Sequence, residues 1–344
     1  MVNQSRGPAE PDRSAIVANL NPLLRLFTIM DGSIQPPDAW HDWETIVSES
    51  IVPADGSNKR FLGSRDERRC IFCDRDRNST SFRDDAHVIP AAFGNRTLFT
   101  YAECDDCNQT PGSQLEDDLA KFMSLPRVMT RFAGRKGTPK LRRKGHTSYL
   151  KANLQSNSVY IHQPDETEDS VNFVDNEDGS FTLNVKVPKH RTANVARALG
   201  RMALFLLPTD FEYFNSLRSW VMRDRDWFPI PLTAFHAPGC ETKQTTIAVE
   251  RYRPMRGRCI LRVSFRYSSY FLFMPIPVDN WELPAGVPML NLSGVPLHIR
   301  VAVLQNVSEF LIPDNEPDET GISSVCVTYG DRETTLHGKE KAEP

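Results

Sequence analysis

Two short stretches, "CIFC" at Cys70–Cys73 and "CDDC" at Cys104–Cys107, decide how the first half of this chain folds. Each is a Cys-x-x-Cys pair, and two such pairs can place four thiolates tetrahedrally around one Zn²⁺ ion. A structural zinc ion suits a segment with too little apolar core to fold alone. The alternative is that the two pairs are unrelated and reduced. We expect a structural zinc site formed by Cys70, Cys73, Cys104 and Cys107.

Two polar side chains near these pairs are candidates for a base and for a metal ligand. His87 lies in "DDAHVIP", between the two pairs, and Asn108 directly follows the second pair. A neutral imidazole can deprotonate water at physiological pH. A hard cation such as Mg²⁺ or Mn²⁺ prefers oxygen ligands, and an asparagine offers an amide oxygen. The alternatives are a structural histidine in a hairpin and an asparagine that caps a helix.

The combined pattern "CIFC…AHVIPAAFGN…CDDCNQTPGSQLE" resembles the HNH endonucleases, which are zinc-containing ββα-metal nucleases. The match covers residues 70–119. The resemblance implies a β-hairpin that leads into a helix, with one catalytic divalent ion, Mg²⁺ or another metal such as Mn²⁺, at their junction. His87 would be the general base and Asn108 the helix-borne metal ligand. Gly112 and Glu116 match the glycine and the acidic residue that follow the second pair.

The sequence departs from this family at Ala86, because most relatives have an acidic ligand directly before the histidine. Strand alternation places Asp84 on the same face as Ala86, one pleat or roughly 6 to 7 Å away. Asp85 shares a face with His87 and reaches the site only if the strand is bulged. Asp84 is therefore the candidate second metal ligand, and Asp85 is a further candidate catalytic residue.

The motif's middle position is also open, with Asn95 or Thr100 as candidates. We expect an active endonuclease with a rearranged ligand set, acting in prokaryotic restriction or phage defence as such nucleases do. The alternative is a catalytically degenerate zinc module that only binds DNA.

Positive charge is concentrated after the second cysteine pair, although the net charge of the chain is −3. No Asp or Glu occurs from Leu119 to Gln163. Lysines and arginines in such a run would contact phosphates with largely sequence-independent affinity, unless the run is only a solvated linker. We expect DNA, double-stranded in the first instance, as the partner. The candidate nucleic-acid-binding residues are Arg135, Lys136, Lys140, Arg142, Arg143 and Lys144.

Hydrophobic periodicity divides the chain into four parts. Residues 1–60 are a partly flexible lead-in, 61–134 form the HNH module, 135–330 form a larger domain, and 331–344 are a charged tail that we expect to be disordered. The larger domain begins with the basic entry segment 135–151. Alternating segments and two helical segments predict an antiparallel β-sheet with a helical pair. The fold class is therefore α+β, with a small zinc-stabilised ββα-metal module before the larger domain.

The larger domain has a second basic array, in which Arg258, Arg262 and Arg266 share one face of a predicted strand. This array could extend the nucleic-acid surface or bind an anion, so a nuclease switched on by a nucleotide ligand is a lower-ranked alternative. A homodimer is left open as well. No apolar run is long enough to cross a membrane and no apolar signal core is present. These features, with scattered remaining cysteines, predict a cytoplasmic protein without a membrane partner.

Overall fold

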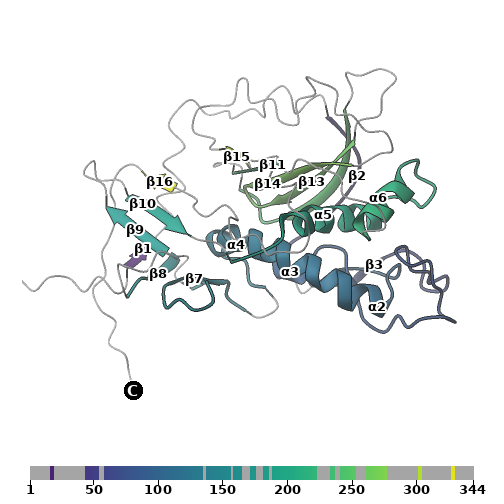
Figure 1. The fold of residues 1–344 in the computed structure, drawn as a ribbon, viewed down its shortest axis with the longest axis horizontal. Coiled ribbons are helices and arrows are strands. Elements are labelled where there is room, and N and C mark those ends of the chain that lie inside the picture. The colour runs from purple at the N-terminus through teal and green to yellow at the C-terminus, as the bar shows by residue number, and fades with distance from the viewer. Residues whose placement is uncertain are drawn as a thin grey trace, which may run out of the picture.

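The computed structural model confirms the predicted α+β class, with helices and four small to medium sheets among the residues it describes (Figure 1). The described residues are 16–18, 43–53, 58–134, 137–155, 158–164, 171–175, 181–185, 188–222, 233–236, 241–252, 261–276, 301–303 and 327–329.

The segment around the cysteine pairs forms a small sheet in the order β3-β5-β4. Its strands are β3 (Arg60–Leu62), β4 (Ala86–His87) and β5 (Leu98–Thr100). β4 and β5 are antiparallel, with Ala86 opposite Thr100 and His87 opposite Phe99. The 3-10 helix η1 (Ala91–Phe93) lies between them and ends at Gly94, which has a φ of +87°. A side chain at Gly94 would also collide with Pro53, because its Cβ would lie 2.4 Å from the proline Cβ.

One continuous helical stretch follows the hairpin, as the resemblance implies. It consists of α2 (Asp105–Cys107), η2 (Asn108–Gly112) and α3 (Ser113–Phe122). The middle piece is a π-helical turn in which the Ser113 N–H donates to the Asn108 carbonyl oxygen. Pro111 lies inside this turn and has no N–H to donate, which favours a departure from regular α-helix. α4 (Ser124–Thr130) comes next.

A second sheet, in the order β1-β8-β7-β6, packs on α4. Its antiparallel strands are β1 (Ile16–Ala18), β6 (Lys140–Arg142), β7 (Tyr149–Asn153) and β8 (Ser158–His162). Three more strands form the sheet β16-β10-β9, namely β9 (Val171–Asp175), β10 (Phe181–Val185) and β16 (Val327–Tyr329). Leu125 and Val128 of α4 share a buried cluster with the inner face of the second sheet and with Val171 and Val185.

The largest sheet has six antiparallel strands in the order β15-β11-β14-β13-β12-β2. They are β2 (Trp43–Ile51), β11 (Thr233–His236), β12 (Thr245–Tyr252), β13 (Leu261–Tyr267), β14 (Tyr270–Pro275) and β15 (Val301–Val303). β2 forms the edge of this sheet, although the sequence places it in the lead-in. Only Trp43 and Ile51 of β2 are buried. The apolar and polar residues of this segment therefore do not alternate clearly enough to predict a strand of the larger sheet.

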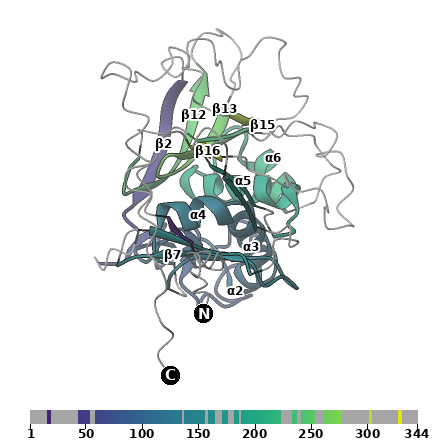
Figure 2. The same ribbon diagram turned by 90° about the vertical axis from the view of Figure 1, so that its left-hand side faces the viewer.

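The predicted helical pair is formed by α5 (Thr192–Leu206) and α6 (Phe214–Val221). Both views place α5 between the large sheet and α3 (Figures 1 and 2). A single buried cluster contains residues of the cysteine segment, of α5 and of the large sheet. Phe72 packs edge-on against Phe205, and Phe93 packs edge-on against Phe265. The cysteine segment and the larger domain therefore share one hydrophobic core.

Across the described ranges, every helix is too short or too polar to span a lipid bilayer.

Candidate functional site

The four cysteine sulfurs come together at one point. All four Sγ atoms lie within 4.8 Å of one another, and Cys73 Sγ is 3.6 Å from Cys104 Sγ. Tetrahedral zinc with Zn–S bonds of about 2.3 Å has S–S separations of about 3.8 Å. The donor set therefore fits a zinc ion. Among the described residues it is also the single group of three or more His, Cys, Asp or Glu side chains close enough to share a metal.

Hydrogen bonds within the cysteine cluster favour a thiolate. The hydrogen bond from the Cys107 thiol is the main cause that lowers the pKa of Cys70 to about 5, although burial opposes it. The same hydrogen bond raises the pKa of Cys107. Outside the cluster, Arg75 Nε donates to Cys73 Sγ at 3.3 Å and its guanidinium pairs with Asp106 at 2.8 Å. Such an outer contact orients a ligand sulfur and favours its charged form.

Asp105, inside the second cysteine pair, fixes the loop that leads to His87. Its carboxylate accepts hydrogen bonds from the backbone N–H groups of Arg83 and Asp84, at 2.9 and 3.0 Å. Its own N–H donates to the Ser81 carbonyl oxygen at 2.9 Å. Burial alone would raise the pKa of Asp105, but these hydrogen bonds and one with the Ser81 side chain outweigh it and lower the pKa. The hairpin strand is thus tied to the cysteine cluster.

Strand β4 includes only Ala86 and His87, and the two aspartates before it make different contacts. The His87 ring lies 4.8 Å from the Phe99 ring, and Lys59 Nζ lies over the same Phe99 ring at 5.1 Å. Lys59 pairs with Asp85 at 2.6 Å, so Asp85 and His87 are on the same side of the hairpin. Asp84 accepts a hydrogen bond from Gln109 Nε2 at 3.0 Å. Asp84 therefore reaches the helix next to Asn108, whereas Asp85 is engaged elsewhere.

Ala86 is fully buried, with an exposed fraction of 0%. Thr100, its partner across the hairpin, is also buried, and its Oγ1 accepts a hydrogen bond from the Ala102 N–H at 3.0 Å. The position where relatives carry a carboxylate is therefore an interior position of this module. Any carboxylate placed there would have to be compensated by a cation or by hydrogen bonds.

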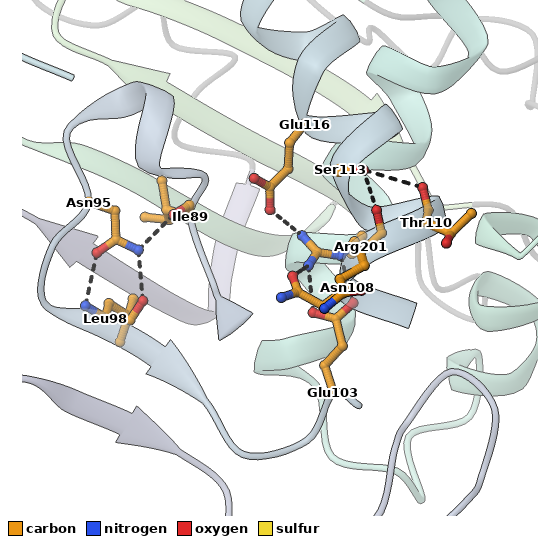
Figure 3. Close-up of polar contacts among 10 residues, drawn as sticks. Ile89, Asn95, Leu98, Glu103, Asn108, Thr110, Ser113, Glu116 and Arg201 are labelled. Carbon is orange, nitrogen blue, oxygen red and sulfur yellow. Dashed lines mark hydrogen bonds and ion pairs between the residues drawn. The ribbon is translucent and has the colours of Figure 1, made fainter. Parts of the chain in front are cut away.

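The side chain of Asn95 is hydrogen-bonded to backbone groups of the loop around it. Its amide nitrogen donates to the carbonyl oxygens of Ile89 and Leu98, at 2.6 and 2.7 Å. Its amide oxygen accepts from the N–H groups of Thr97 and Leu98, at 3.1 and 2.9 Å. Figure 3 shows the bonds with Ile89 and Leu98. Asn95 is buried, and these four bonds close the loop between β4 and β5. Asn95 is one of the two candidates for the middle motif position, and its contacts hold the hairpin together.

Asn108 contacts Arg201, a residue that the sequence analysis does not single out. Arg201 of α5 donates to Asn108 Oδ1 through Nη2 at 3.4 Å. The same guanidinium donates to both oxygens of Glu103, at 3.1 and 2.5 Å, and to Glu116 at 2.9 Å (Figure 3). Arg201 is 2% exposed. One arginine of the larger domain therefore holds the residue before the cysteine pair, the asparagine after it, and the acidic residue of α3.

Gly112 makes room for this arginine. A Cβ at Gly112 would lie 3.2 Å from Arg201 Nη2 and 3.1 Å from the Cys107 carbonyl oxygen. Both residues that follow the second cysteine pair in the family pattern, Gly112 and Glu116, thus face Arg201. No local motif marks Arg201, because it lies far along the chain in an apolar helix; a basic residue on the buried face of that helix was the one available signal.

Burial shifts the pKa values of the two glutamates in this cluster. It raises the pKa of Glu103 to about 7, although the Arg201 charge opposes the shift. It also raises the pKa of Glu116, again against the Arg201 charge. The Arg201 guanidinium, which is shared by buried Glu103 and half-buried Glu116, lies in a low-dielectric environment, where loss of one partner is costly.

Four of the six predicted nucleic-acid-binding residues lie on the second sheet and its loop. Lys140, Arg142 and Lys144 are exposed and Arg143 is half-buried. Arg142 Nε also donates to the His146 carbonyl oxygen at 2.8 Å. Arg135 and Lys136 lie outside the described residues.

Two arginines of the second basic array, Arg262 and Arg266, make contacts within the large sheet. Arg262 is buried, donates to Glu250 at 2.6 Å, and lies over the rings of Trp43 and Phe273 at 3.9 and 4.2 Å. Arg266 Nε donates to the Ser268 carbonyl oxygen at 3.0 Å. Arg258 lies outside the described residues. The contacts of Arg262 are therefore with other residues of the large sheet. This removes the main support for a nucleotide site there.

Comparison with known proteins agrees with the geometry of the cysteine segment. Residues 70–124 match the family model described as HNH endonuclease, which confirms the resemblance seen in the sequence. The segment is therefore an HNH module within a longer chain. Neither the curated proteins nor the solved structures contain a match to this chain.

Proposed function

We propose that this chain is a metal-dependent endonuclease that hydrolyses phosphodiester bonds in DNA. The observation that carries the proposal is that the second cysteine pair is joined both to the segment before His87 and to Asn108. Asp105 of the second cysteine pair holds the backbone before His87, and Asn108 follows directly after the same pair. The HNH family match over these residues supports the same reaction class.

In this proposal His87 is the general base. Its half-buried imidazole on β4 accepts a proton from water, and the water oxygen attacks phosphorus. The bond from phosphorus to the leaving oxygen breaks, and that oxygen is protonated by solvent. Packing of the His87 ring against Phe99 fixes the ring plane, so that less of its rotational freedom is lost in reaching the reactive geometry.

The proposed ligands of the catalytic divalent ion are Asn108 and Asp84. A bound Mg²⁺ or Mn²⁺ would neutralise negative charge on the scissile phosphate. The Asp84 carboxylate is exposed and is joined to the Asn108 turn through Gln109. The Asn108 contact with Arg201 is long at 3.4 Å, so its amide oxygen keeps capacity for a second partner. Asp85 is the weaker catalytic candidate, because its carboxylate pairs with Lys59.

Zinc bound by the four cysteines has a structural role in this proposal, and DNA is held by phosphate contacts from Lys140, Arg142, Arg143 and Lys144. A cytoplasmic enzyme of prokaryotic restriction or phage defence is the setting that the resemblance suggests. A homodimer or a nucleotide activator gains no support from the described contacts and is not included.

The second candidate function is a DNA-binding module that has lost catalysis. The burial of Ala86 favours it, because the interior position that usually supplies an anionic ligand has only a methyl group. In that case the cysteine cluster and Arg201 would maintain the fold, while His87 and Asn108 would be structural.

Plasmid nicking separates the two functions. Supercoiled DNA is incubated with the purified full chain and Mg²⁺, Mn²⁺ or Ni²⁺, with His87→Ala as the control. We expect nicked and linear products with at least one of these metals and a loss of about 100-fold or more in rate for His87→Ala. Equal nicking by wild type and His87→Ala would place the base elsewhere. Absence of nicking with every metal would favour the DNA-binding module.

A further inference from the structure

The outer face of the second sheet carries aromatic and basic side chains in adjacent strands. We call it the basic aromatic face; its members are Lys140, Arg142, Tyr149, Lys151, Tyr160 and His162. The register places Arg142, Tyr149 and His162 in one row across the strands. Lys140, Lys151 and Tyr160 form the next row. The six side chains therefore alternate with the buried positions of the same strands.

The opposite face of this sheet explains why these rings point outward. Leu141, Leu150, Val159 and Ile161 are buried, and they pack with Leu125 and Val128 of α4 and with Val171 and Val185 of the neighbouring sheet. The hydrophobic side chains of the sheet thus pack on its inner side. Aromatic rings on the outer side do not complete this core, since all three are only half-buried.

The three rings lie close together on the sheet. The Tyr149 ring is 4.8 Å from the His162 ring and 6.0 Å from the Tyr160 ring. The Tyr160 and His162 rings are nearly parallel, with 17° between their planes and 6.3 Å between their centroids. Lys140 Nζ lies over the Tyr149 ring at 3.6 Å. Packed rings are rigid contact surfaces that lose little conformational entropy when a flat ligand stacks on them.

The charged side chains of the basic aromatic face are all positive. Lys140, Arg142 and Lys151 are exposed on it, and the absence of Asp and Glu from 119 to 163 leaves the surrounding strands without an acidic neighbour from this segment. A partner must therefore be anionic and must also offer flat apolar rings. A duplex offers phosphates but keeps its base faces stacked inside, whereas an unpaired strand offers both.

We infer that the basic aromatic face binds an unpaired stretch of DNA, with bases stacking on Tyr149, Tyr160 and His162 and phosphates contacting Lys140, Arg142 and Lys151. The inference rests on the proposed action on DNA and deepens it by naming the substrate class. α4 carries the inner side of this sheet and follows α3 of the HNH module after one residue. A strand held here would therefore be positioned by a short, packed connection relative to the nuclease site.

Binding is measured by fluorescence anisotropy on the full chain with no added divalent metal, so that the signal does not depend on cleavage. The probes are a single-stranded DNA oligonucleotide, the duplex of the same sequence, and the corresponding single-stranded RNA. The test variant is Tyr149→Leu with Tyr160→Leu, which removes rings and leaves charge unchanged. The matched control is Tyr252→Leu, because Tyr252 is also a half-buried strand tyrosine but lies in the large sheet.

We expect wild type to bind single-stranded DNA more tightly than duplex. The double variant should lose about tenfold or more of its affinity for single-stranded DNA per ring removed. Its duplex affinity should change by less than about twofold, since paired bases offer no open face. Tyr149→Phe with Tyr160→Phe should keep wild-type affinity, because the rings remain. Tyr252→Leu should behave as wild type.

Photocross-linking tests the same point without any substitution, in case the double variant does not fold. Single-stranded DNA carrying 5-iodouracil should cross-link to Tyr149, Tyr160 or His162 of the wild-type chain, as mapped by mass spectrometry. Cross-links confined to other regions would overturn the inference, as would equal losses for single-stranded and duplex DNA. Tighter binding of RNA than of DNA would overturn the choice of DNA. Binding of unpaired DNA by a chain that nicks no plasmid would sink only the nuclease proposal, and nicking without single-strand binding would sink only this inference.

Discussion

The two sides of the HNH module are built in opposite ways. On one side, three of the four cysteines are buried, and buried Arg201 donates hydrogen bonds to Glu103 and Glu116. On the other side, Asp84 and Asp85 are exposed. Asp84 accepts a hydrogen bond from Gln109, and Asp85 accepts one from Lys59. The buried charged groups therefore hold the module to the larger domain, through the contacts of Arg201 with Glu103 and Glu116. The hairpin side is left with groups that can exchange partners.

The largest expected effect is on the buried side, at the cysteine cluster. Cys104→Ser should abolish stable zinc binding and unfold the segment from 70 to 123, because one missing thiolate opens a closed four-ligand site. Wild type should contain about one Zn²⁺ per chain by metal analysis. Limited proteolysis should then cut the variant, and not wild type, between the cysteine pairs. A zinc-free wild-type chain that is reduced and folded would contradict this.

Arg201→Met should lower the free energy of unfolding by about 3 to 5 kcal/mol, because it leaves buried Glu103 and half-buried Glu116 without their cation. The matched control is Arg262→Met, which removes an equally buried guanidinium that has one carboxylate partner and two aromatic rings. We expect a smaller loss there, about 1 to 3 kcal/mol. Urea unfolding of the zinc-loaded proteins measures both. Equal losses would mean that Arg201 is not a special junction.

Glu103 predicts a pH dependence of stability. Its pKa of about 7 in the folded chain lies above its ordinary value of 4.5, so between these values the folded state holds a proton that the unfolded state has released. Stability is therefore full below about pH 4.5 and falls as the pH rises through 7, by at most about 3 kcal/mol. Urea midpoints from pH 5 to 8 should show this decline in wild type. Glu103→Gln should flatten it; an identical slope in both proteins would assign the titration to other groups.

Ala86→Asp tests where the two sides meet. A carboxylate at this buried position should cost about 1 to 3 kcal/mol without metal. Added Mg²⁺ should recover part of that stability and should support cleavage at a lower Mg²⁺ concentration than wild type needs, while His87 stays essential. Thermal unfolding and nicking at graded Mg²⁺ measure the two effects. Cleavage by Ala86→Asp beside a wild type that is inert with every metal would show a lost site.

Asp84→Ala should have the smallest effect on folding, within about 0.5 kcal/mol, since Asp84 is exposed. It should nevertheless raise the Mg²⁺ concentration required for nicking if Asp84 is the substitute ligand, and leave DNA binding unchanged. Asp85→Ala is the matched control, because its carboxylate pairs with Lys59 on the other face. A similar metal requirement in both variants would remove Asp84 from the ligand set.

Much of the cysteine segment could be predicted from local sequence patterns. The spacing of the two pairs predicts the cluster, and strand alternation places Asp85 beside His87 and Asp84 toward the helix, as the contacts have it. These features depend on neighbours in sequence. The α+β class and the helical pair also follow from periodicity, because buried faces repeat every two or every 3.6 residues.

Contacts between distant segments could not be predicted in the same way. Arg201 meets Glu103 and Glu116 only because α5 packs on α3, and nothing near Arg201 in sequence records that packing. The edge strand β2 joins β12 by backbone hydrogen bonds, which any sequence can make. The array at Arg262 was interpreted from one strand alone, whereas Glu250 on the neighbouring strand decides its role.

The π-helical turn from Asn108 to Gly112 has a consequence for the phase of the helix around its own axis. In a regular α-helix each residue advances by about 100°, so Asn108 and Glu116 would point about 80° apart. A wide turn absorbs one extra residue, and the two side chains then align as if seven positions separated them, within about 20°. Deleting one residue of the turn would restore a regular α-helix and keep the two side chains aligned, because seven positions would then separate them. Making the turn regular at its present length would instead rotate Glu116 by about 100° relative to Asn108, away from Arg201. With eight positions between the two residues, their common orientation toward Arg201 therefore depends on the wide turn.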